Sequence, residues 1–373
     1  MTTYRSDRPA NGCGEARQEE KVEPSKQQGI LAFIFCLFTL TVLAVSGLPL
    51  AAERPPQQHG LAPPESQPRT VPSIQALTVV GTRTVFAGSF GLGVFRSDDR
   101  GGTWSPVNAG LTDPFVLCLA TAEDGTVYAG TFRAGVFRSQ DGGKSWHALN
   151  AGLKHLEIKT LLIVGGVIYA GTGDGVYRLS GTDGQWTVVT KGLDETLVHT
   201  LARGADGTLF AGTSGKGVMR YRATGSEWKR LSHGLVDHEG LGENFIRVLA
   251  MDKEQGLYAG TFDGGVFRSG DGGQTWRPIS RALPNDSIRG IVASEKGLFV
   301  ATGRGIFKSQ NQGRQWTALN HGLTELSVQV LIATGGGALY AGTSSGVFRS
   351  DDDGMNWVTI SEGLQGVSES PFK

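Results

Sequence analysis

The chain has 373 residues with 35 basic and 35 acidic side chains, so its formal net charge is zero and its pI is near 7.1. A neutral chain gives no indication of nucleic-acid binding, which usually requires a basic surface. Glycine is abundant at 56 residues, which favours many tight turns between short strands. The three cysteines are too scattered to indicate a disulfide framework or a zinc site.

Residues 30–52 form an uncharged, largely apolar segment of 23 positions near the N-terminus. A membrane-spanning helix needs about 20 such residues, so this segment is long enough to cross a bilayer. More basic residues precede it, in the polar segment 1–29, than follow it closely, which favours a cytoplasmic N-terminus. Cleavage as a secretory signal near Ala44 is the alternative. Both interpretations place the chain after residue 52 on the exported, periplasmic or extracellular side, either anchored to the cell membrane or secreted.

Residues 53–72 contain six prolines in twenty positions. This composition favours a stiff, extended linker rather than a packed element. The rest of the chain is expected to form one large domain over residues 73–364 and a short tail over residues 365–373.

Seven tryptophans recur along the large domain at intervals of 42, 40, 42, 48, 40 and 41 residues. They are Trp104, Trp146, Trp186, Trp228, Trp276, Trp316 and Trp357. A repeat of about 40 residues is typical of propeller blades and of solenoids. The content of one period therefore has to distinguish the two folds.

Each period contains four short apolar runs separated by turns that are rich in Gly, Asp and Asn. In the second period these runs are residues 115–121, 126–132, 135–139 and 146–149. Such runs are typical of strands joined by hairpins, and no helical period is sustained after residue 72. The sequence therefore predicts an all-β fold, a seven-bladed propeller of four-stranded antiparallel blades, preceded by one N-terminal transmembrane or signal helix.

The turn before most of the tryptophans repeats the pattern Ser-x-Asp-x-Gly-x-Thr-Trp, which resembles the Asp-box of the BNR-repeat families. Three copies match it, two are partial, and the Asp is absent around Trp186 and Trp228. In such a turn the Asp accepts backbone N–H groups, the Gly adopts a positive φ, and the Trp fills the gap between sheets. Because a catalytic residue does not need five copies, we assign a structural role to Asp99, Trp104, Asp141, Trp146, Asp271, Trp276, Asp352 and Trp357.

The resemblance to the BNR-repeat families covers residues 73–364 and implies the propeller fold. Such repeats occur in sialidases, xyloglucanases, sortilin-type receptors and assembly factors similar to the photosystem II stability factor. Sortilin-type receptors have more blades and a cysteine-rich module, and xyloglucanases pair two propellers around a cleft. A single ring of seven blades behind a membrane segment is most similar to the last group. The resemblance therefore implies an assembly-factor-like scaffold that binds a protein partner.

One position in the first strand of each blade escapes the apolar pattern of its neighbours. The first strands share the pattern apolar-x-x-apolar, and the second position is occupied by Gln75, Leu117, Lys159, His199, Arg247, Arg289 and Gln329. Because the first strand of a blade lines the propeller axis, these side chains are expected to ring the channel mouth. Four consecutive basic or titratable members predict a mouth that attracts anionic groups, such as an acidic segment of a partner. The alternative is that they bond channel waters or neighbouring carbonyls.

The hairpins between second and third strands add a candidate docking face, because aromatic residues and arginine dominate the anchors of protein interfaces. This face consists of Phe90, Phe132, Arg133, Phe262 and Arg304, and the same hairpins hold Asp174, Lys216 and Asp263. The alternative is that each Phe packs onto its own blade.

The connection 232–247 is longer than the others and contains His233, Asp237, His238, Glu239 and Glu243. Their spacing matches no metal-ligand pattern, so a solvated loop is expected. The sequence as a whole predicts no metal ion and no cofactor.

Catalytic signatures are weak throughout the chain. A sialidase needs three arginines for the substrate carboxylate, which Arg247 and Arg289 supply only in part, and the Arg-Ile-Pro motif of that family is absent. A glycosidase needs two carboxylates that face each other, and nothing in the pattern pairs Asp174, Asp263 or Glu157. The sequence therefore predicts a non-enzymatic scaffold, with a carbohydrate-binding or glycoside-hydrolase-type propeller as the alternative.

Overall fold

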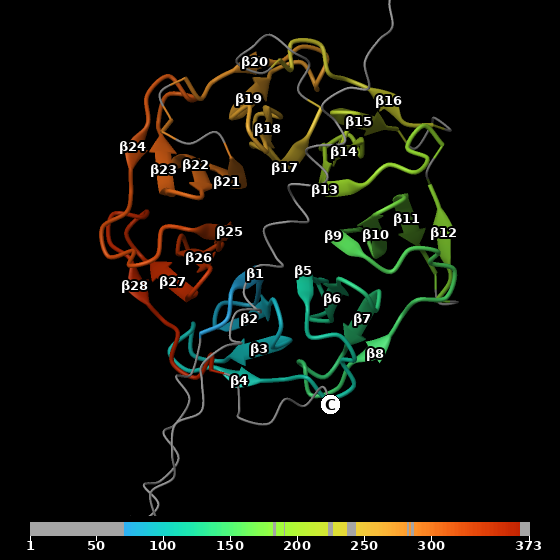
Figure 1. Cartoon of the computed structure of the whole chain (residues 1–373), viewed down its shortest axis with the longest axis vertical. Helices are drawn as coiled ribbons and strands as arrows, with labels where there is room; N and C mark the ends of the chain where they lie inside the picture. The colour runs from blue at the N-terminus through green and yellow to red at the C-terminus, as the bar shows by residue number, and fades with distance from the viewer. Residues whose placement is uncertain are drawn as a thin grey trace, which may run out of the picture. The chain divides into compact units, whose positions relative to one another are not determined.

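The computed structural model describes residues 71–181, 184–189, 191–222, 227–236, 244–281, 283–284 and 287–365. These residues form seven four-stranded antiparallel sheets arranged in a ring (Figure 1), which confirms the predicted propeller. The predicted N-terminal helix over residues 30–52 lies outside the described residues. Within the described ranges, no helix is long and apolar enough to cross a membrane.

The strands follow one another from the axis outwards in every blade. The first strands are β1 (Ile74–Val80), β5 (Val116–Thr121), β9 (Ile158–Val164), β13 (Val198–Arg203), β17 (Ile246–Met251), β21 (Ile288–Ser294) and β25 (Val328–Ala333). The second strands are β2 (Thr84–Ser89), β6 (Val127–Thr131), β10 (Val167–Thr172), β14 (Leu209–Thr213), β18 (Leu257–Thr261), β22 (Gly297–Thr302) and β26 (Leu339–Thr343). The third strands are β3 (Val94–Ser97), β7 (Val136–Ser139), β11 (Gly175–Leu179), β15 (Val218–Tyr221), β19 (Val266–Ser269), β23 (Gly305–Ser309) and β27 (Gly346–Ser350). The outer strands are β4 (Ser105–Pro106), β8 (His147–Ala148), β12 (Trp186–Val188), β16 (Lys229–Arg230), β20 (Arg277–Pro278), β24 (Thr317–Ala318) and β28 (Val358–Thr359).

The blades decrease in thickness towards the axis because small residues occupy the inner half of each sheet. The Cβ atom of a side chain at Gly88 would come within 2.6 Å of Val116 in the next blade, so only glycine fits there. In blade 6 the glycine of this pair lies on the first strand instead of the second, since Gly290 pairs with Ala301. The total volume of the pair therefore stays small in a blade whose sequence departs from the repeat.

Each tryptophan bridges two blades. Trp146 is buried between blades 1 and 2, and its Nε1 donates a hydrogen bond to the carbonyl of Val107 at 2.7 Å. The same donation to the preceding blade occurs at all seven tryptophans, and the donor–acceptor distances span 2.6 to 3.0 Å. Trp316 is the one tryptophan that is only partly buried. The sequence prediction that these residues fill the gaps between sheets is thus confirmed.

Residues 360–364 close the ring between blades 7 and 1. The backbone N–H of Trp104 bonds to the carbonyl of Glu362, and its Nε1 bonds to the carbonyl of Ile360. Leu364 is fully buried in the same interface, where β1 also contacts β25 and β26. The two ends of the propeller are therefore joined by the same contacts that join every other pair of blades.

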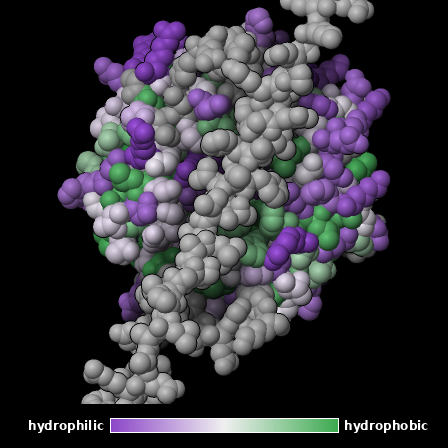
Figure 2. All heavy atoms as spheres, viewed as in Figure 1, coloured by the Kyte–Doolittle hydropathy of each residue, from purple (hydrophilic) through white to green (hydrophobic). Residues whose placement is uncertain are grey.

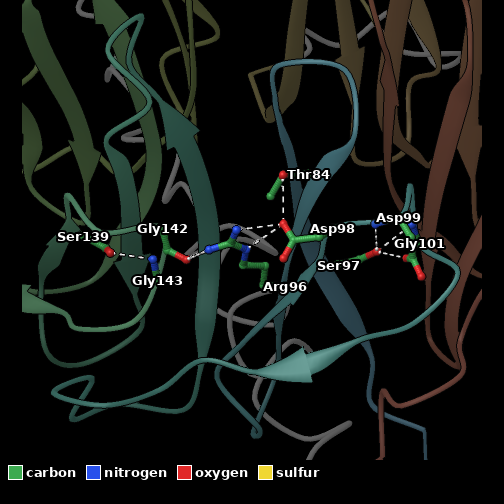
Figure 3. Close-up of polar contacts among 9 residues, drawn as sticks. All are labelled: Thr84, Arg96, Ser97, Asp98, Asp99, Gly101, Ser139, Gly142 and Gly143. Carbon is green, nitrogen blue, oxygen red and sulfur yellow. Dashed lines mark hydrogen bonds and ion pairs between the residues drawn. The ribbon is translucent and has the colours of Figure 1, made fainter.

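The Asp-box turns are built as the sequence predicts. Asp99 accepts hydrogen bonds from Ser97 Oγ at 2.7 Å and from the backbone N–H of Thr103 at 2.9 Å. These bonds lower the pKa of the Asp99 carboxyl to about 2. Gly101 adopts a φ of 95°, and its N–H donates to Ser97 Oγ at 2.7 Å (Figure 3). The Asp99 carboxylate is thus used as a hydrogen-bond acceptor within its own turn.

Outer strands and turns are exposed, and hydrophilic residues gather along the outer edge of the ring (Figure 2). Figure 3 also shows Arg96, which contacts Asp98 in its own blade and reaches the Asp-box turn of blade 2. Its Nη1 donates to the carbonyl of Gly142 at 2.6 Å. Polar contacts at the edge thereby supplement the tryptophan bonds between blades.

We expect Trp146→Ala to lower the free energy of unfolding by about 3–5 kcal/mol, because it removes a buried aromatic side chain from the interface between two blades. Asp141→Ala removes acceptors from an exposed turn and should cost less. Trp146→Phe keeps an aromatic ring but removes the Nε1–H donor, so its effect measures the contribution of the hydrogen bond to the Val107 carbonyl. Urea denaturation of the three variants measures these differences, and a larger loss for Asp141→Ala than for Trp146→Ala would contradict the assignment.

Candidate binding site at the channel mouth

One face of the ring carries the start of every first strand. In blade 1 the first residue of β1, Ile74, pairs with the last residue of β2, Ser89. The same face therefore carries the hairpins from second to third strands and the connections into the first strands. We call it the mouth face. The Asp-box turns lie on the opposite side, where the third strands end.

The second residue of each first strand lies at a β-bulge. In every blade it is skipped by the pairing between first and second strands: Gln75, Leu117, Lys159, His199, Arg247, Arg289 and Gln329. A bulge leaves the extra residue unpaired and redirects its side chain. All seven residues are partly buried, whereas the residue before each of them is fully buried. The sequence position that escapes the apolar pattern thus corresponds to a backbone irregularity repeated around the axis.

Lys159, His199, Arg247 and Arg289 follow one another in blades 3 to 6. His199 Nε2 lies 2.6 Å from Ser214 Oγ, and its ring centroid lies 5.0 Å from that of Phe262. The guanidinium carbon of Arg247 lies 5.2 Å from the same ring centroid. Phe262 therefore contacts two neighbouring members of the ring and fixes their relative position.

The members of this cluster influence one another electrostatically. Burial, and then the charges of Lys159 and Arg247, lower the pKa of His199 to about 3. Burial, and then the charge of Arg289, lower the pKa of Arg247 to about 10. His199 is consequently neutral at physiological pH, and the arginines remain charged in a partly desolvated setting.

Carboxylates neutralise this cluster unevenly. Lys159 Nζ lies 2.5 Å from Glu157 Oε1, and Glu157 directly precedes the same strand, β9. This member of the ring is therefore neutralised, which departs from the expectation of a ring without carboxylate partners. No carboxylate of the described ranges pairs with Arg247 or Arg289. Arg289 Nη1 donates to Ser327 Oγ at 2.9 Å, and its Nε is buried without a hydrogen-bond partner among those residues. Among the described residues, the charge without a carboxylate partner is therefore centred on blades 5 and 6.

The bulge positions of blades 7, 1 and 2 are uncharged. Gln75 Nε2 donates to Ser73 Oγ at 2.9 Å, and Gln329 Nε2 donates to Ser327 Oγ at 3.2 Å. Leu117 occupies the bulge of blade 2. At the bulge positions the mouth thus has a cationic side with Lys159, Arg247 and Arg289 and a neutral side formed by blades 7, 1 and 2.

The candidate docking residues differ in their exposure. Phe132 is 40% exposed, but Phe262 and Phe90 are partly buried, and the ring of Phe90 packs edge-on against Phe115 at 4.7 Å between centroids. The expectation of three exposed phenylalanines therefore applies to Phe132 alone. Arg304 Nη1 lies 3.5 Å from the carbonyl of Pro284.

Arg133 depends on two residues that the repeat pattern does not single out. The carboxylate of Asp113 is buried and accepts the backbone N–H of Arg133 at 2.6 Å. The guanidinium of Arg133 lies over the ring of Phe115, 4.7 Å from its centroid. Asp113 lies in the connection before β5 and Phe115 opens the first apolar run of blade 2, so periodicity located the run without indicating that both residues contact Arg133. The one sequence signal for a structured loop here is the succession of an acid, a proline and an aromatic residue, Asp113-Pro114-Phe115.

Metal ligands are not grouped anywhere in the described part of the chain: no set of three His, Cys, Asp or Glu side chains there could hold an ion. Of the acidic connection considered in the sequence, residues 237–243 lie outside the described ranges.

Comparisons with known proteins agree with the repeat and the fold. Residues 94–107 match the BNR-Asp box repeat, and residues 137–148 match the BNR/Asp-box repeat. No curated protein matches the sequence significantly. A GH74 enzyme of Niastella koreensis has a similar structure at 14% identity and a TM-score of 0.64, with 79% of this chain and 55% of that chain covered. This chain thus spans about half the length of that enzyme.

Two structures of YCF48 are also similar. YCF48 bound to a D1 peptide aligns at 15% identity and a TM-score of 0.59, covering 74% of this chain and 92% of that chain. YCF48 from Cyanidioschyzon merolae aligns at 14% identity and a TM-score of 0.56, covering 76% of this chain and 95% of that chain. At these identities the similarity establishes the fold alone.

We expect His199→Gln to reduce the loss of stability on acidification. The unfolded chain takes up a proton on His199 near pH 6.5, whereas the folded chain does so only at about pH 3. Stability should therefore fall between these values as the pH decreases, by up to about 1.4 kcal/mol per pH unit from this residue. Urea denaturation at pH 7 and pH 4.5 measures the effect, with His147→Gln at an exposed position as the control. Equal acid sensitivity of all three proteins would contradict the assignment.

Proposed function

We propose that this seven-bladed propeller with BNR/Asp-box repeats binds an acidic segment of a protein partner at its channel mouth, as an assembly-factor-like scaffold tethered to the exported side of a membrane. The observation that supports it is the neighbouring pair Arg247 and Arg289. Both guanidiniums are partly buried, and neither has a carboxylate partner in the described ranges. Two adjacent guanidiniums can bind a carboxylate through charge-assisted hydrogen bonds, and partial burial strengthens such contacts.

The neutral side of the mouth supports a peptide rather than a small anion. Phe132, Leu156 and Leu326 are each about 40% exposed, at 40%, 38% and 41%, and they lie in hairpins or connections of the mouth face. A peptide that places an acidic residue on blades 5 and 6 would have apolar surface available beside it. YCF48, a similarly folded protein, has been solved with a D1 peptide bound, which supports peptide binding as a use of this fold.

A carbohydrate-binding or glycoside-hydrolase-type function is the second candidate, favoured by the similarity to the GH74 enzyme. Such an activity requires two carboxylates positioned across a substrate. Glu157 is paired with Lys159, and Asp174 accepts hydrogen bonds from Thr172 Oγ1 at 2.7 Å and Tyr177 Oη at 2.9 Å. These carboxylates are engaged by their own neighbours, so the cationic mouth favours anion binding over glycoside hydrolysis.

Tethering rests on the sequence of residues 30–52. An uncharged segment of this length, with a polar segment before it and a proline-rich linker after it, would hold the propeller near the outer surface of the membrane. The mouth would then be available to membrane-embedded or exported partners.

Binding to the mouth should depend on Arg247 and Arg289 together. The probe is a synthetic peptide with a run of glutamates, and a glutamine peptide of the same length is its control. We expect the double variant Arg247→Gln/Arg289→Gln to weaken binding at least about tenfold with little change in melting temperature. Arg83→Gln/Arg314→Gln, at exposed positions on the opposite face, is the matched control. Unchanged affinity in the mouth variant would overturn the proposal.

Added salt should weaken the same interaction, because the reach of exposed charges shortens to about 8 Å at physiological ionic strength. Isothermal titration at low and physiological salt measures this slope. A salt slope that is equal in the wild type and in the mouth variant would show that binding occurs elsewhere.

A reporter fused after residue 60 should be active only outside the cytoplasm, and the protein should stay in the membrane fraction after a salt wash. Both outcomes follow from an uncleaved anchor with a cytoplasmic N-terminus. Recovery of a soluble form that begins near Gly47 would show instead that the segment is a cleaved signal.

A further inference from the structure

The third strand of every blade carries a basic residue near the outer edge of the ring, away from the mouth face. Each lies directly opposite an aromatic residue of the second strand, and the seven cations are Arg96, Arg138, Arg178, Arg220, Arg268, Lys308 and Arg349. In four blades the charge lies over that ring, 4.9 to 5.9 Å from its centroid. A pairing present in all blades is part of the framework, so differences between blades around it are informative.

Blades 1 and 7 neutralise this cation locally. Arg96 lies 2.8 Å from Asp98, and Arg349 lies 2.6 Å from Asp351, in each case an acid two residues further along the chain. The residue that faces the arginine on the outer strand carries no charge: it is Ser105 in blade 1 and Val358 in blade 7.

Blade 5 departs from this arrangement at both positions. Gly270 lies where blades 1 and 7 have the acid, a position that is also without an acid in blades 2, 3, 4 and 6, and Arg277 of β20 lies directly opposite Arg268 of β19. Like charges that face each other across two strands are destabilising. Neither guanidinium has a carboxylate partner within the described ranges, so the blade retains an unfavourable pair without a structural compensation.

Arg268 is nevertheless held in place. Its Nε donates to Tyr258 Oη at 3.2 Å, and Tyr258 Oη in turn donates to Asp252 Oδ2 at 3.0 Å. The terminal nitrogens of Arg268 make no hydrogen bond to the described residues. A fixed guanidinium with free terminal donors is preorganised for an external acceptor.

The two arginines line one surface pocket together with Gly270, Asp271, Thr275 and Trp276. The carboxylate of Asp271 is directed at its own turn, where it accepts Ser269 Oγ, the N–H of Thr275 and Thr275 Oγ1. The pocket therefore holds two guanidiniums against one occupied carboxylate. In the preceding blade Arg220 faces Lys229, so positive charge continues along this edge.

We propose that this pocket on the outer edge of blade 5 binds a phosphate or sulfate group, separately from the channel mouth. Two guanidiniums on adjacent strands offer parallel N–H donors that suit the oxygens of a tetrahedral anion. Binding of such an anion would remove the repulsion between Arg268 and Arg277. The group can come from a phospholipid headgroup or from a soluble ester, and the experiment separates these sources.

The test measures how fast an arginine-specific dicarbonyl, phenylglyoxal, modifies each arginine, with peptide mass spectrometry as the readout. We expect pyrophosphate to slow the modification of Arg268 and Arg277 by at least about threefold relative to Arg349, whose guanidinium already has an acid. A second arm replaces pyrophosphate with vesicles of phosphatidylglycerol in phosphatidylcholine. Protection by pyrophosphate shows that a soluble phosphate group is sufficient to bind the pocket. Protection by vesicles alone shows that the pocket binds a headgroup at a bilayer surface.

Two variants use the repeat as their own control. Gly270→Asp places an acid where blades 1 and 7 have one; its φ is not positive, and the added Cβ would lie 3.6 Å from Arg268 Nη1. This variant should abolish the protection of Arg277. The reverse change in blade 7, Asp351→Gly/Val358→Arg, should create protection at Arg349.

Three results would overturn the proposal: no protection in either arm, equal protection of all exposed arginines, or protection that persists in Gly270→Asp. Arg277→Ser copies the outer strand of blade 1 and serves if Gly270→Asp does not fold. In that variant Arg268 should lose its protection, and retained protection would also overturn the assignment.

Discussion

In every blade a tryptophan indole donates its Nε1–H to a carbonyl of the preceding blade, and this cross-blade hydrogen bond is the interaction on which the ring depends. A buried indole N–H that lacked an acceptor would cost roughly 1–3 kcal/mol, so the bond also fixes where the ring of the tryptophan can lie. The Asp-box turn precedes the tryptophan and sets its entry into the interface. Each blade is therefore positioned by its neighbour, and closure through residues 360–364 makes the set of contacts circular.

This framework leaves two places free to carry charge. At the axis, the bulge at the second residue of each first strand releases one side chain per blade from packing. At the outer edge, the third strand carries one cation per blade opposite an aromatic residue of the second strand. We expect substitutions at these positions to leave the indole hydrogen bonds between blades in place, because none of these side chains is the donor or acceptor in them. Arg247 and Arg289 at the mouth and Arg277 at the edge are accordingly candidates for recognition rather than for stability.

Because the blades repeat one pattern, each residue can be compared with the residues at the equivalent position in the other blades. The exchange of Gly290 and Ala301 in blade 6 preserves the volume of an inner pair, so it is compensated within the fold. In blade 5 the cation Arg268 has no acid at Gly270, and Arg277 adds a second positive charge opposite it without a compensating carboxylate among the described residues. Compensated differences are accounted for by packing, whereas an uncompensated difference marks a candidate functional site, which is the basis of the proposal for blade 5.

The sequence by itself determined the number of blades, the four strands in each, the Asp-box turns and the placement of the tryptophans. These features depend on local turn chemistry and on a period of about 40 residues, both of which are readable along the chain. It also identified the bulge positions as an exception to the apolar pattern, although not as bulges. The tertiary structure alone decided which charges meet. Phe262 of blade 5 contacts His199 of blade 4 as well as Arg247 of its own blade, and the facing of Arg268 by Arg277 depends on strand register. Such contacts depend on distances across strands and blades, and a sequence period cannot specify them.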